Sequence, residues 1–156
     1  MSAVRLFTLL PQAFRHALHA IRPEDSVATF CKQHLLLGAV DVLAVGKAAP
    51  CLGAAAHNAL SHRCKRLLIV TGHATPTDNL PAAAEVLRAS HPYPDCTSLH
   101  AAERALGFVR DTRADGILVL VSGGTSAMLS APPDGCSPAD KARIVEQLLR
   151  SGATIQ

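Results

Sequence analysis

The sequence has 156 residues, a length that suits a single domain with a substantial buried core. Hydrophobic residues make up 49% of it and charged residues 17%, a balance typical of a folded globular chain and not of a disordered one. The net charge of +3 is small, the basic residues are scattered and aromatic residues make up 3%, so composition argues against a nucleic-acid-binding protein.

The five cysteines are odd in number and far apart, with no C-x-x-C pair and no histidine at a zinc spacing. This pattern predicts reduced thiols and a cytoplasmic protein. The apolar stretch 35–45 is too short for a membrane span and is interrupted by Asp41, so no membrane interaction is expected. The first 22 residues contain three arginines and no acid, which is also typical of an amphipathic targeting segment. A mitochondrial location is therefore the alternative to a cytoplasmic one.

The spacing of apolar residues predicts strands that alternate with helices along the chain. Short apolar runs rich in β-branched residues indicate buried strands, and apolar residues three or four positions apart indicate helices. Pro11 is expected to separate a short first turn from the helix that follows it. The expected elements, in order, are a helix over 4–21, a helix within 24–38, a strand over 40–45, a helix ending at 60, a strand over 66–71, a loop over 74–81, a strand over 85–89, a helix from 98, a strand over 117–121, a helix starting in 122–126 and a helix over 138–150.

This alternation implies βαβ units and hence an α/β fold. We expect a Rossmann-like, largely parallel sheet with helices on both faces, which makes a three-layer sandwich. The helix from Ser98 is expected to bury one stripe: Leu99, Ala102, Leu106 and Val109. Because the chain stops at 153–156, directly after a helix stop and at the start of an apolar, β-prone segment, we expect a truncated fold.

A turn rich in glycine and hydroxyl groups follows the last predicted strand. The apolar stretch 117–121 runs into Ser122-Gly123-Gly124-Thr125-Ser126 and then into apolar residues again. Glycines let a ligand approach the main chain closely, and free amides with hydroxyl donors favour a phosphate or a carboxylate. The turn is therefore a candidate anion-binding loop. The alternative is an ordinary glycine-rich turn capped by serine or threonine.

A second candidate segment, Gly46-Lys47, follows the predicted strand over 40–45. Because the carboxyl ends of parallel strands meet at one rim of a sheet, Lys47 is expected to reach the same anion as the 122–126 turn. A cation at the start of a helix is electrostatically unfavourable, which favours a functional role for Lys47 over that of a solvated lysine.

His91 and Asp95 flank a loop stiffened by two prolines, after the predicted strand over 85–89. They are candidates for binding a substrate hydroxyl or for acid and base chemistry. The alternative is a structured turn in which Asp95 caps the next helix. The sequence predicts no metal site in the protein itself, and it lacks the G-x-G-x-x-G, Walker and G-x-S-x-G motifs, so phosphate chemistry here needs a less common cradle.

Several separated segments resemble, in order, one family of enzymes. They are Val45-Gly46-Lys47-Ala48-Ala49 with its Ala-rich helix, Asp78-Asn79-Leu80-Pro81, His91-Pro92-Tyr93-Pro94-Asp95, the stretch 120–129 and the stretch 151–155. Together they resemble the glycerate 2-kinases that carry a C-terminal MOFRL domain. The likeness covers nearly the whole chain after residue 40.

The resemblance implies ATP-dependent phosphorylation of D-glycerate to 2-phosphoglycerate, with ATP and Mg²⁺. It implies that Lys47 is the catalytic cation and that the phosphate- or substrate-binding residues are Gly46, Ser122, Gly123, Gly124, Thr125, Ser126, His91 and Asp95. Thr125 departs from the family's usual glycine, and a positive φ at that position would strain the loop. The resemblance also implies that residues 1–156 are an incomplete N-terminal kinase domain without its MOFRL domain, which we expect to be inactive alone.

Two other functions fit the same residues. One is a non-catalytic α/β module that binds a phosphate or a carboxylate without turnover. The other is a hydrolase that uses Ser122 or Ser126, which requires a histidine and an acid near that serine.

Overall fold

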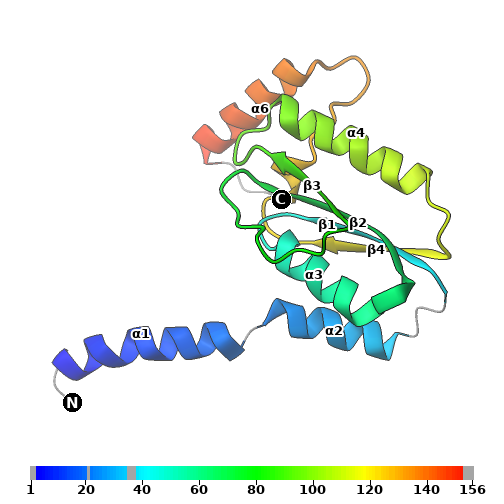
Figure 1. Ribbon diagram of the computed structural model, residues 1–156. Helices are drawn as coiled ribbons and strands as arrows, with labels where there is room; N and C mark the ends of the chain where they lie inside the picture. Colours follow the sequence, from blue (N-terminus) through cyan, green and yellow to red (C-terminus); the bar gives the residue numbers. More distant parts are fainter. Residues whose placement is uncertain (1–2, 21, 35–37, 153–156) are drawn as a thin grey trace.

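The computed structural model describes residues 3–20, 22–34 and 38–152 (Figure 1). Strands and helices alternate through most of the chain, as the apolar pattern predicts. The elements are α1 (Ala3–Ala20), α2 (Pro23–Gln33), β1 (Val40–Val45), α3 (Ala49–Leu60), a short 3-10 helix η1 (Ser61–Arg63), β2 (Cys64–Gly72), β3 (Ala84–Ala89), α4 (Cys96–Arg110), β4 (Gly116–Val121), α5 (Thr125–Met128) and α6 (Pro138–Ser151).

The four described strands form one sheet in the order β3-β2-β1-β4, and every neighbouring pair is parallel. At the carboxyl end of β1, Val45 is in register with Val70 of β2 and Val121 of β4. The predicted α/β fold with a parallel sheet is therefore confirmed. Because β1 and β4 are neighbours, the segments that follow them emerge at the same rim.

Helices cover both faces of the sheet (Figure 1). One apolar cluster joins α2 and α3 to the side chains of β1 that point to their face, such as Val42 and Ala44. The other joins α4 and Met128 of α5 to the opposite face, where Leu43 and Val45 of β1 lie. Side chains alternate between the two faces along a strand, and all six residues of β1 are buried. This central strand fixes the position of the rim beyond it.

Two helix predictions are wrong in detail. The first helix is continuous from Ala3 to Ala20 with Pro11 inside it, and no break separates off a first turn. Pro11 is exposed, so water can replace the backbone hydrogen bond that proline removes. Ile21, which the predicted helix also included, lies outside the described residues, as does the apolar segment 153–156.

The second correction concerns α4, which begins at Cys96 instead of Ser98. Asp95 is its N-cap, so the helix begins two residues earlier than expected, and its buried face also differs from the expected one. Leu106 and Val109, both expected in the core, are exposed, and Leu99 is half-buried. The residues that face the sheet are smaller, apart from Phe108: Ser98, Ala101, Ala102 and Ala105.

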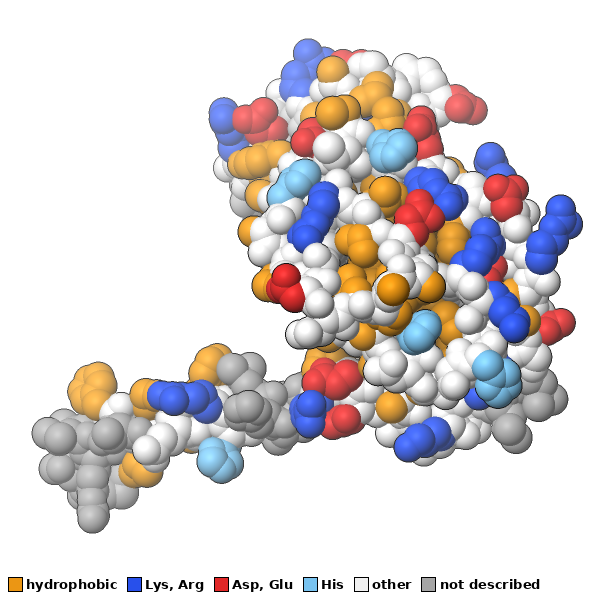
Figure 2. Space-filling model, in the orientation of Figure 1, with side chains coloured by type: hydrophobic (Ala, Val, Ile, Leu, Met, Phe, Trp, Pro, Cys, Tyr) orange, Lys and Arg blue, Asp and Glu red, His pale blue; other side chains and the backbone are white. Residues whose placement is uncertain are grey.

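Helix α1 projects away from the body formed by the sheet and the other helices (Figure 1). Apolar side chains lie exposed along it, as Figure 2 shows; the described ones are Phe7, Leu9, Leu10 and Phe14. Within the described ranges, none of the helices has the length and apolarity needed to cross a bilayer. All five cysteines are free thiols, which agrees with the prediction from their spacing.

Candidate functional site

The turns after β1 and β4 are bonded to each other at the carboxyl rim of the sheet. The backbone amide of Lys47 donates to the carbonyl of Gly123 at 2.9 Å. The Ser122 hydroxyl accepts from the amide of Ala48 at 3.1 Å and donates to the carbonyl of Val45 at 3.1 Å. The structure thus brings together two segments that are more than seventy residues apart in the chain, as the sequence predicts.

Two glycines make this close approach possible. Gly46 has φ of +114°, and a Cβ atom there would collide with the side chain and carbonyl of Ser122. Gly124 has φ of +94°, and a Cβ atom there would lie 2.9 Å from Cδ2 of the His91 ring. Both positions combine a left-handed backbone with a close neighbour, so only glycine fits without strain.

The hydroxyl groups of the 122–126 turn divide into two kinds. Thr125 Oγ1 donates to main-chain carbonyls, lying 2.7 Å from that of Ser122 and 3.2 Å from that of Val45. Together with the Ser122 hydroxyl, it fastens the turn to the end of β1. Ser126 is exposed, and its hydroxyl has no partner among the residues that the structure describes. Ser126 is therefore the hydroxyl of this turn that is open to a ligand.

The backbone of Thr125 is not strained, although the sequence suggested strain if this residue, which replaces the family's usual glycine, had a positive φ. Among the described residues, Ser61 is the non-glycine residue with a positive φ. The left-handed position of the turn is Gly124, and Thr125 begins the short helix α5. The substitution is thus compatible with the turn and adds a hydroxyl that stabilises it.

Lys47 is exposed at the rim, and its ammonium forms no ion pair with the described part of the chain. Its backbone is fixed on both sides, because the Gly46 amide donates to the Val70 carbonyl at 2.9 Å and the Lys47 amide to Gly123. An exposed cation on a fixed backbone, beside a turn with an open hydroxyl, is an arrangement that can hold a phosphate or a carboxylate.

His91 and Asp95 both lie near this rim, but their environments differ. The ring of His91 packs against Gly124, so His91 borders the 122–126 turn. Asp95 is the N-cap of α4, and its carboxylate accepts from the amide of Thr97 at 2.9 Å and from that of Ser98 at 3.3 Å. The bond from the Thr97 hydroxyl, these two amides and the nearby His73 hold the pKa of Asp95 below its usual value. The capping role expected as the alternative is thus confirmed for Asp95, and its ligand-binding role stays a prediction.

A match to a known domain family identifies the domain to which this rim belongs. The family described as "Domain of unknown function (DUF4147)" matches residues 9–156. The chain belongs to this family. The match begins within α1 and includes both turns of the rim, so the rim is part of the DUF4147 domain.

The chain is similar to proteins named for glycerate and for hydroxypyruvate. The chain is 32% identical over 146 residues to the D-glycerate 2-kinase of Thermotoga maritima, covering 91% of this chain and 34% of the relative. It is 38% identical over 122 residues to an Agrobacterium vitis protein provisionally named a hydroxypyruvate reductase, covering 76% and 31%. The crystal structure of a Thermotoga maritima glycerate kinase superposes with a TM-score of 0.76 and 28% identity, covering 97% of this chain and 36% of that one. The chain thus spans about a third of the length of these relatives.

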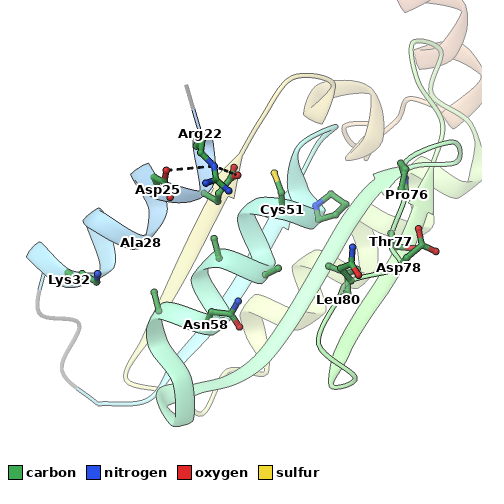
Figure 3. A pocket seen from close by; sticks show the side chains of 16 residues that line it. Arg22, Asp25, Ala28, Lys32, Cys51, Asn58, Pro76, Thr77, Asp78 and Leu80 are labelled. Atoms are coloured by element: carbon green, nitrogen blue, oxygen red, sulfur yellow. Dashed lines mark hydrogen bonds and ion pairs between the residues drawn. The ribbon is translucent and has the colours of Figure 1, made fainter. Parts of the chain in front are cut away.

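A separate groove of about 840 Å³ lies between α2, α3 and the loop over 76–80 (Figure 3). Its lining includes alanines of α2 and α3 together with charged side chains, among them Arg22, Lys32 and Asp78. Arg22 is already paired with Glu24, at 3.1 Å between Nε and Oε1. None of the predicted site residues lines this groove. The predicted site is the open rim of the DUF4147 domain, and this groove is a different feature.

Sequence reasoning missed two residues that support the rim. Thr71, buried at the end of β2, donates from its hydroxyl to the carbonyl of Gly46 at 3.1 Å. Arg88 donates to the carbonyls of Gly72 and His73 at 2.9 and 3.1 Å, which fixes the loop after β2. Thr71 could have been found from the sequence, because it is a polar residue at the end of a buried strand. The role of Arg88 becomes visible only in the folded structure.

Proposed function

We propose that this chain forms the ligand-binding rim of a glycerate 2-kinase, which transfers the γ-phosphoryl group of ATP to D-glycerate. The observation that supports this most directly is the bonding of the Lys47 turn to the 122–126 turn at one rim. The substrates are inferred from the similarity to named glycerate kinases. ATP and D-glycerate are both anions, and the rim offers a cation, a hydroxyl group and the backbone amides of a glycine-rich turn.

The described residues fit the phosphate groups of ATP better than they fit a free metal ion. Among them, no group of three histidine, cysteine, aspartate or glutamate side chains is placed to hold a metal. Mg²⁺ commonly binds through substrate phosphates with few protein ligands, so it would arrive with ATP and neutralise phosphate charge. Lys47 and the open Ser126 are the side chains that we propose to contact the anionic groups.

In this proposal, the protein contributes positioning and charge. Phosphoryl transfer needs the attacking hydroxyl in line with the phosphorus atom and positive charge on the transferred oxygens. The Lys47 ammonium would stabilise that negative charge, while the fastened turn over 122–126 would hold its amides in fixed directions. The ring of His91, which packs against Gly124, would form one border of the site.

We further propose that the 156-residue chain binds these ligands without turning them over. Lys47 and Ser126 are exposed, and catalysis of phosphoryl transfer requires a site from which water is excluded. This chain spans about a third of the length of the relative named a D-glycerate 2-kinase. The non-catalytic binding module remains the second candidate for the chain by itself.

A reductase function is supported by the Agrobacterium vitis relative. Hydroxypyruvate and glycerate are the oxidised and reduced forms of one hydroxy acid, so a reductase and a kinase of this family can share a glycerate-binding rim. The relative named a D-glycerate 2-kinase matches 91% of this chain and the solved glycerate kinase 97%, whereas the relative named for hydroxypyruvate matches 76%. The kinase is therefore the better supported of the two.

A hydrolase function has less support from the geometry. The Ser122 hydroxyl bonds to main-chain groups of Val45 and Ala48, and no described histidine is bonded to it. Failure of a serine-reactive probe to label the chain would remove this alternative.

Calorimetric titration of the chain with ATP-Mg²⁺, with D-glycerate and with NADH tests the proposal. We expect heat from ATP-Mg²⁺ and from D-glycerate, none from NADH, and no 2-phosphoglycerate on incubation with both substrates. Binding of NADH in place of ATP would support the reductase. Absence of binding by both ATP-Mg²⁺ and D-glycerate would contradict the proposed site, and formation of 2-phosphoglycerate would contradict inactivity of the chain alone.

A further inference from the structure

The segments after β2 and β3 leave the sheet side by side, at the same rim as the turns after β1 and β4. Gly72, the last residue of β2, is in register with Ala89, the last residue of β3. His73 follows the first of these strand ends, and His91 lies two residues beyond the second. Since neighbouring strands lie about 4.8 Å apart, the two histidine-bearing segments begin close together.

Both segments also meet the 122–126 turn. A Cβ atom on Gly72 would lie 3.5 Å from Cε of Met128, and one on Gly124 would lie 3.1 Å from the same atom. The side chain of Met128 therefore contacts both the end of β2 and the turn. The ring of His91 packs directly against Gly124. Met128 belongs to the apolar cluster on the α4 face of the sheet, so the histidine-bearing segments border the turn from that face.

The loop that carries His73 is fixed by Arg88 of β3. The guanidinium donates to four acceptors of this loop, which are the carbonyls of Gly72, His73 and Thr75 and the hydroxyl of Thr77. Because these bonds hold the loop before any ligand arrives, less of the binding free energy is lost in ordering it. Arg88 therefore presents His73 at the rim from a preorganised backbone.

His73 and His91 are both exposed, and neither imidazole has a hydrogen-bond partner among the residues that the structure describes. The Thr97 hydroxyl chiefly, and also the charge of His73, lower the pKa of Asp95, so His73 lies near this carboxylate. That carboxylate is already bonded to the amides of Thr97 and Ser98 in the cap of α4. The imidazole N–H groups are therefore available to donate to the anionic group of a ligand.

We propose that His73 and His91 bind the carboxylate of the phosphoryl acceptor, so that this rim selects a small 2-hydroxy acid and not a polyol. This inference rests on the proposed glycerate 2-kinase function. Lys47 leads into α3, which covers the face of the sheet opposite to α4 (Figure 1). The 122–126 turn thus lies between a cation from one face and two imidazoles from the other. The phosphates of ATP would bind on the Lys47 side, and the hydroxyl groups of D-glycerate would lie at the turn, beside Ser126.

Calorimetric titration of the wild-type chain and of histidine variants tests the proposal. His73→Ala and His91→Ala should each lower the affinity for D-glycerate about tenfold, because each removes a hydrogen bond to a charged group. The affinity for ATP-Mg²⁺ should stay within about twofold of the wild type. His73→Gln keeps an N–H donor and should restore most of the affinity for D-glycerate. Circular dichroism verifies that each variant is folded.

The matched control is His62→Ala, which removes an exposed histidine at the opposite, amino end of β2 and should change neither affinity. A second measurement does not depend on variants. The side-chain ¹H–¹⁵N resonances of His73 and His91 should shift on addition of D-glycerate and stay unmoved on addition of glycerol, which has no carboxylate.

The outcomes separate this inference from the function on which it rests. If both ligands bind the wild type but His73→Ala and His91→Ala leave the affinity for D-glycerate unchanged, the carboxylate subsite is overturned and the kinase proposal stands. Equal losses of affinity for ATP-Mg²⁺ and D-glycerate would also overturn a separate carboxylate subsite. If neither ligand binds the wild type, both proposals are overturned.

Discussion

A charged residue lies near each end of the central strand β1, and the two differ in burial and in ion pairing. At its amino end, Asp41 is 1% exposed and pairs with Arg66, which also stacks on Phe108 at 4.3 Å and donates to that residue's carbonyl. At its carboxyl end, Lys47 is exposed and unpaired within the described residues. Charge that is buried and fully bonded stabilises a fold, whereas an exposed, unpaired cation on a fixed backbone is available to a ligand.

The bonding around each residue supports this distinction. Asp41 also accepts from the Thr112 hydroxyl at 2.7 Å, so the carboxylate is held by three donor atoms from two side chains. Around Lys47, the hydrogen bonds involve the main chain and the hydroxyls of the neighbouring turn, and the ammonium takes no part in them. The amino end therefore has a structural role, and we assign ligand binding to the carboxyl rim.

The largest expected effect on stability comes from the amino end. Asp41→Ala leaves Arg66 without its carboxylate and removes three hydrogen bonds, so the free energy of unfolding should fall by about 2–3 kcal/mol. Urea denaturation measures this loss. Ligand binding by the folded fraction should be unchanged. A large drop in ligand affinity would contradict a purely structural role for the amino end of β1.

The largest expected effect on binding comes from Lys47. Lys47→Ala removes one charge-assisted contact to the anion, which corresponds to a loss of affinity of about tenfold to a hundredfold. Calorimetry with ATP-Mg²⁺ or D-glycerate measures it. The melting temperature should not change, because the lysine side chain forms no hydrogen bond or ion pair with the residues that the structure describes. Lys65→Ala is the matched control, since Lys65 is also exposed and donates only to the carbonyl of His62 among the described groups; equal losses in the two variants would indicate a nonspecific charge effect.

Asp95 gives a smaller effect that separates its two candidate roles. Asp95→Ala removes the cap of α4 and should cost about 1 kcal/mol of stability. Asp95→Ser keeps a capping oxygen and should restore most of that stability. If Asp95 is a cap only, both variants bind D-glycerate as the wild type does. Weak binding of D-glycerate by the stable serine variant would indicate that Asp95 also contacts the ligand.

The smallest expected effect is in the acid limb of the stability curve. Burial raises the pKa of Asp41, but the hydrogen bonds from Arg66 and Thr112 outweigh it, so the folded pKa lies below the unfolded value. Its contribution to stability is complete above an unfolded pKa of about 3.9 and is lost as pH falls through the folded pKa. Denaturation curves of wild type and Asp41→Asn should therefore converge as pH falls below about 4. Curves that stay parallel to the lowest accessible pH would refute this assignment.

The strands and the meeting of the two turns could be predicted because they depend on simple rules. Runs such as Val40–Val45 are apolar apart from Asp41, which in a chain of this length indicates strands buried on both faces. Once β1 and β4 are parallel neighbours, the residues after them must emerge at one rim. The positive φ of Gly46 and Gly124 also agrees with the use of glycine in these turns.

The details that could not be predicted depend on tertiary contacts. The buried face of α4 consists mostly of small residues, among them Ala101 and Ala105, that pack on the sheet, whereas apolar spacing alone favoured Leu106 and Val109. The support that Thr71 gives to Gly46 requires knowledge of which strands are adjacent. The division of the hydroxyls, with Thr125 bonded and Ser126 open, also depends on where the end of β1 lies.

The central claim is that the Lys47 turn and the 122–126 turn bind the same anion. Amide chemical shifts in a ¹H–¹⁵N spectrum, followed during titration with ATP-Mg²⁺ and separately with D-glycerate, test it most directly. We expect Lys47, Gly123, Gly124 and Ser126 to shift together and to give one dissociation constant for each ligand. Shifts confined to the groove around Cys51 and Asn58, with the rim amides unmoved, would contradict the claim.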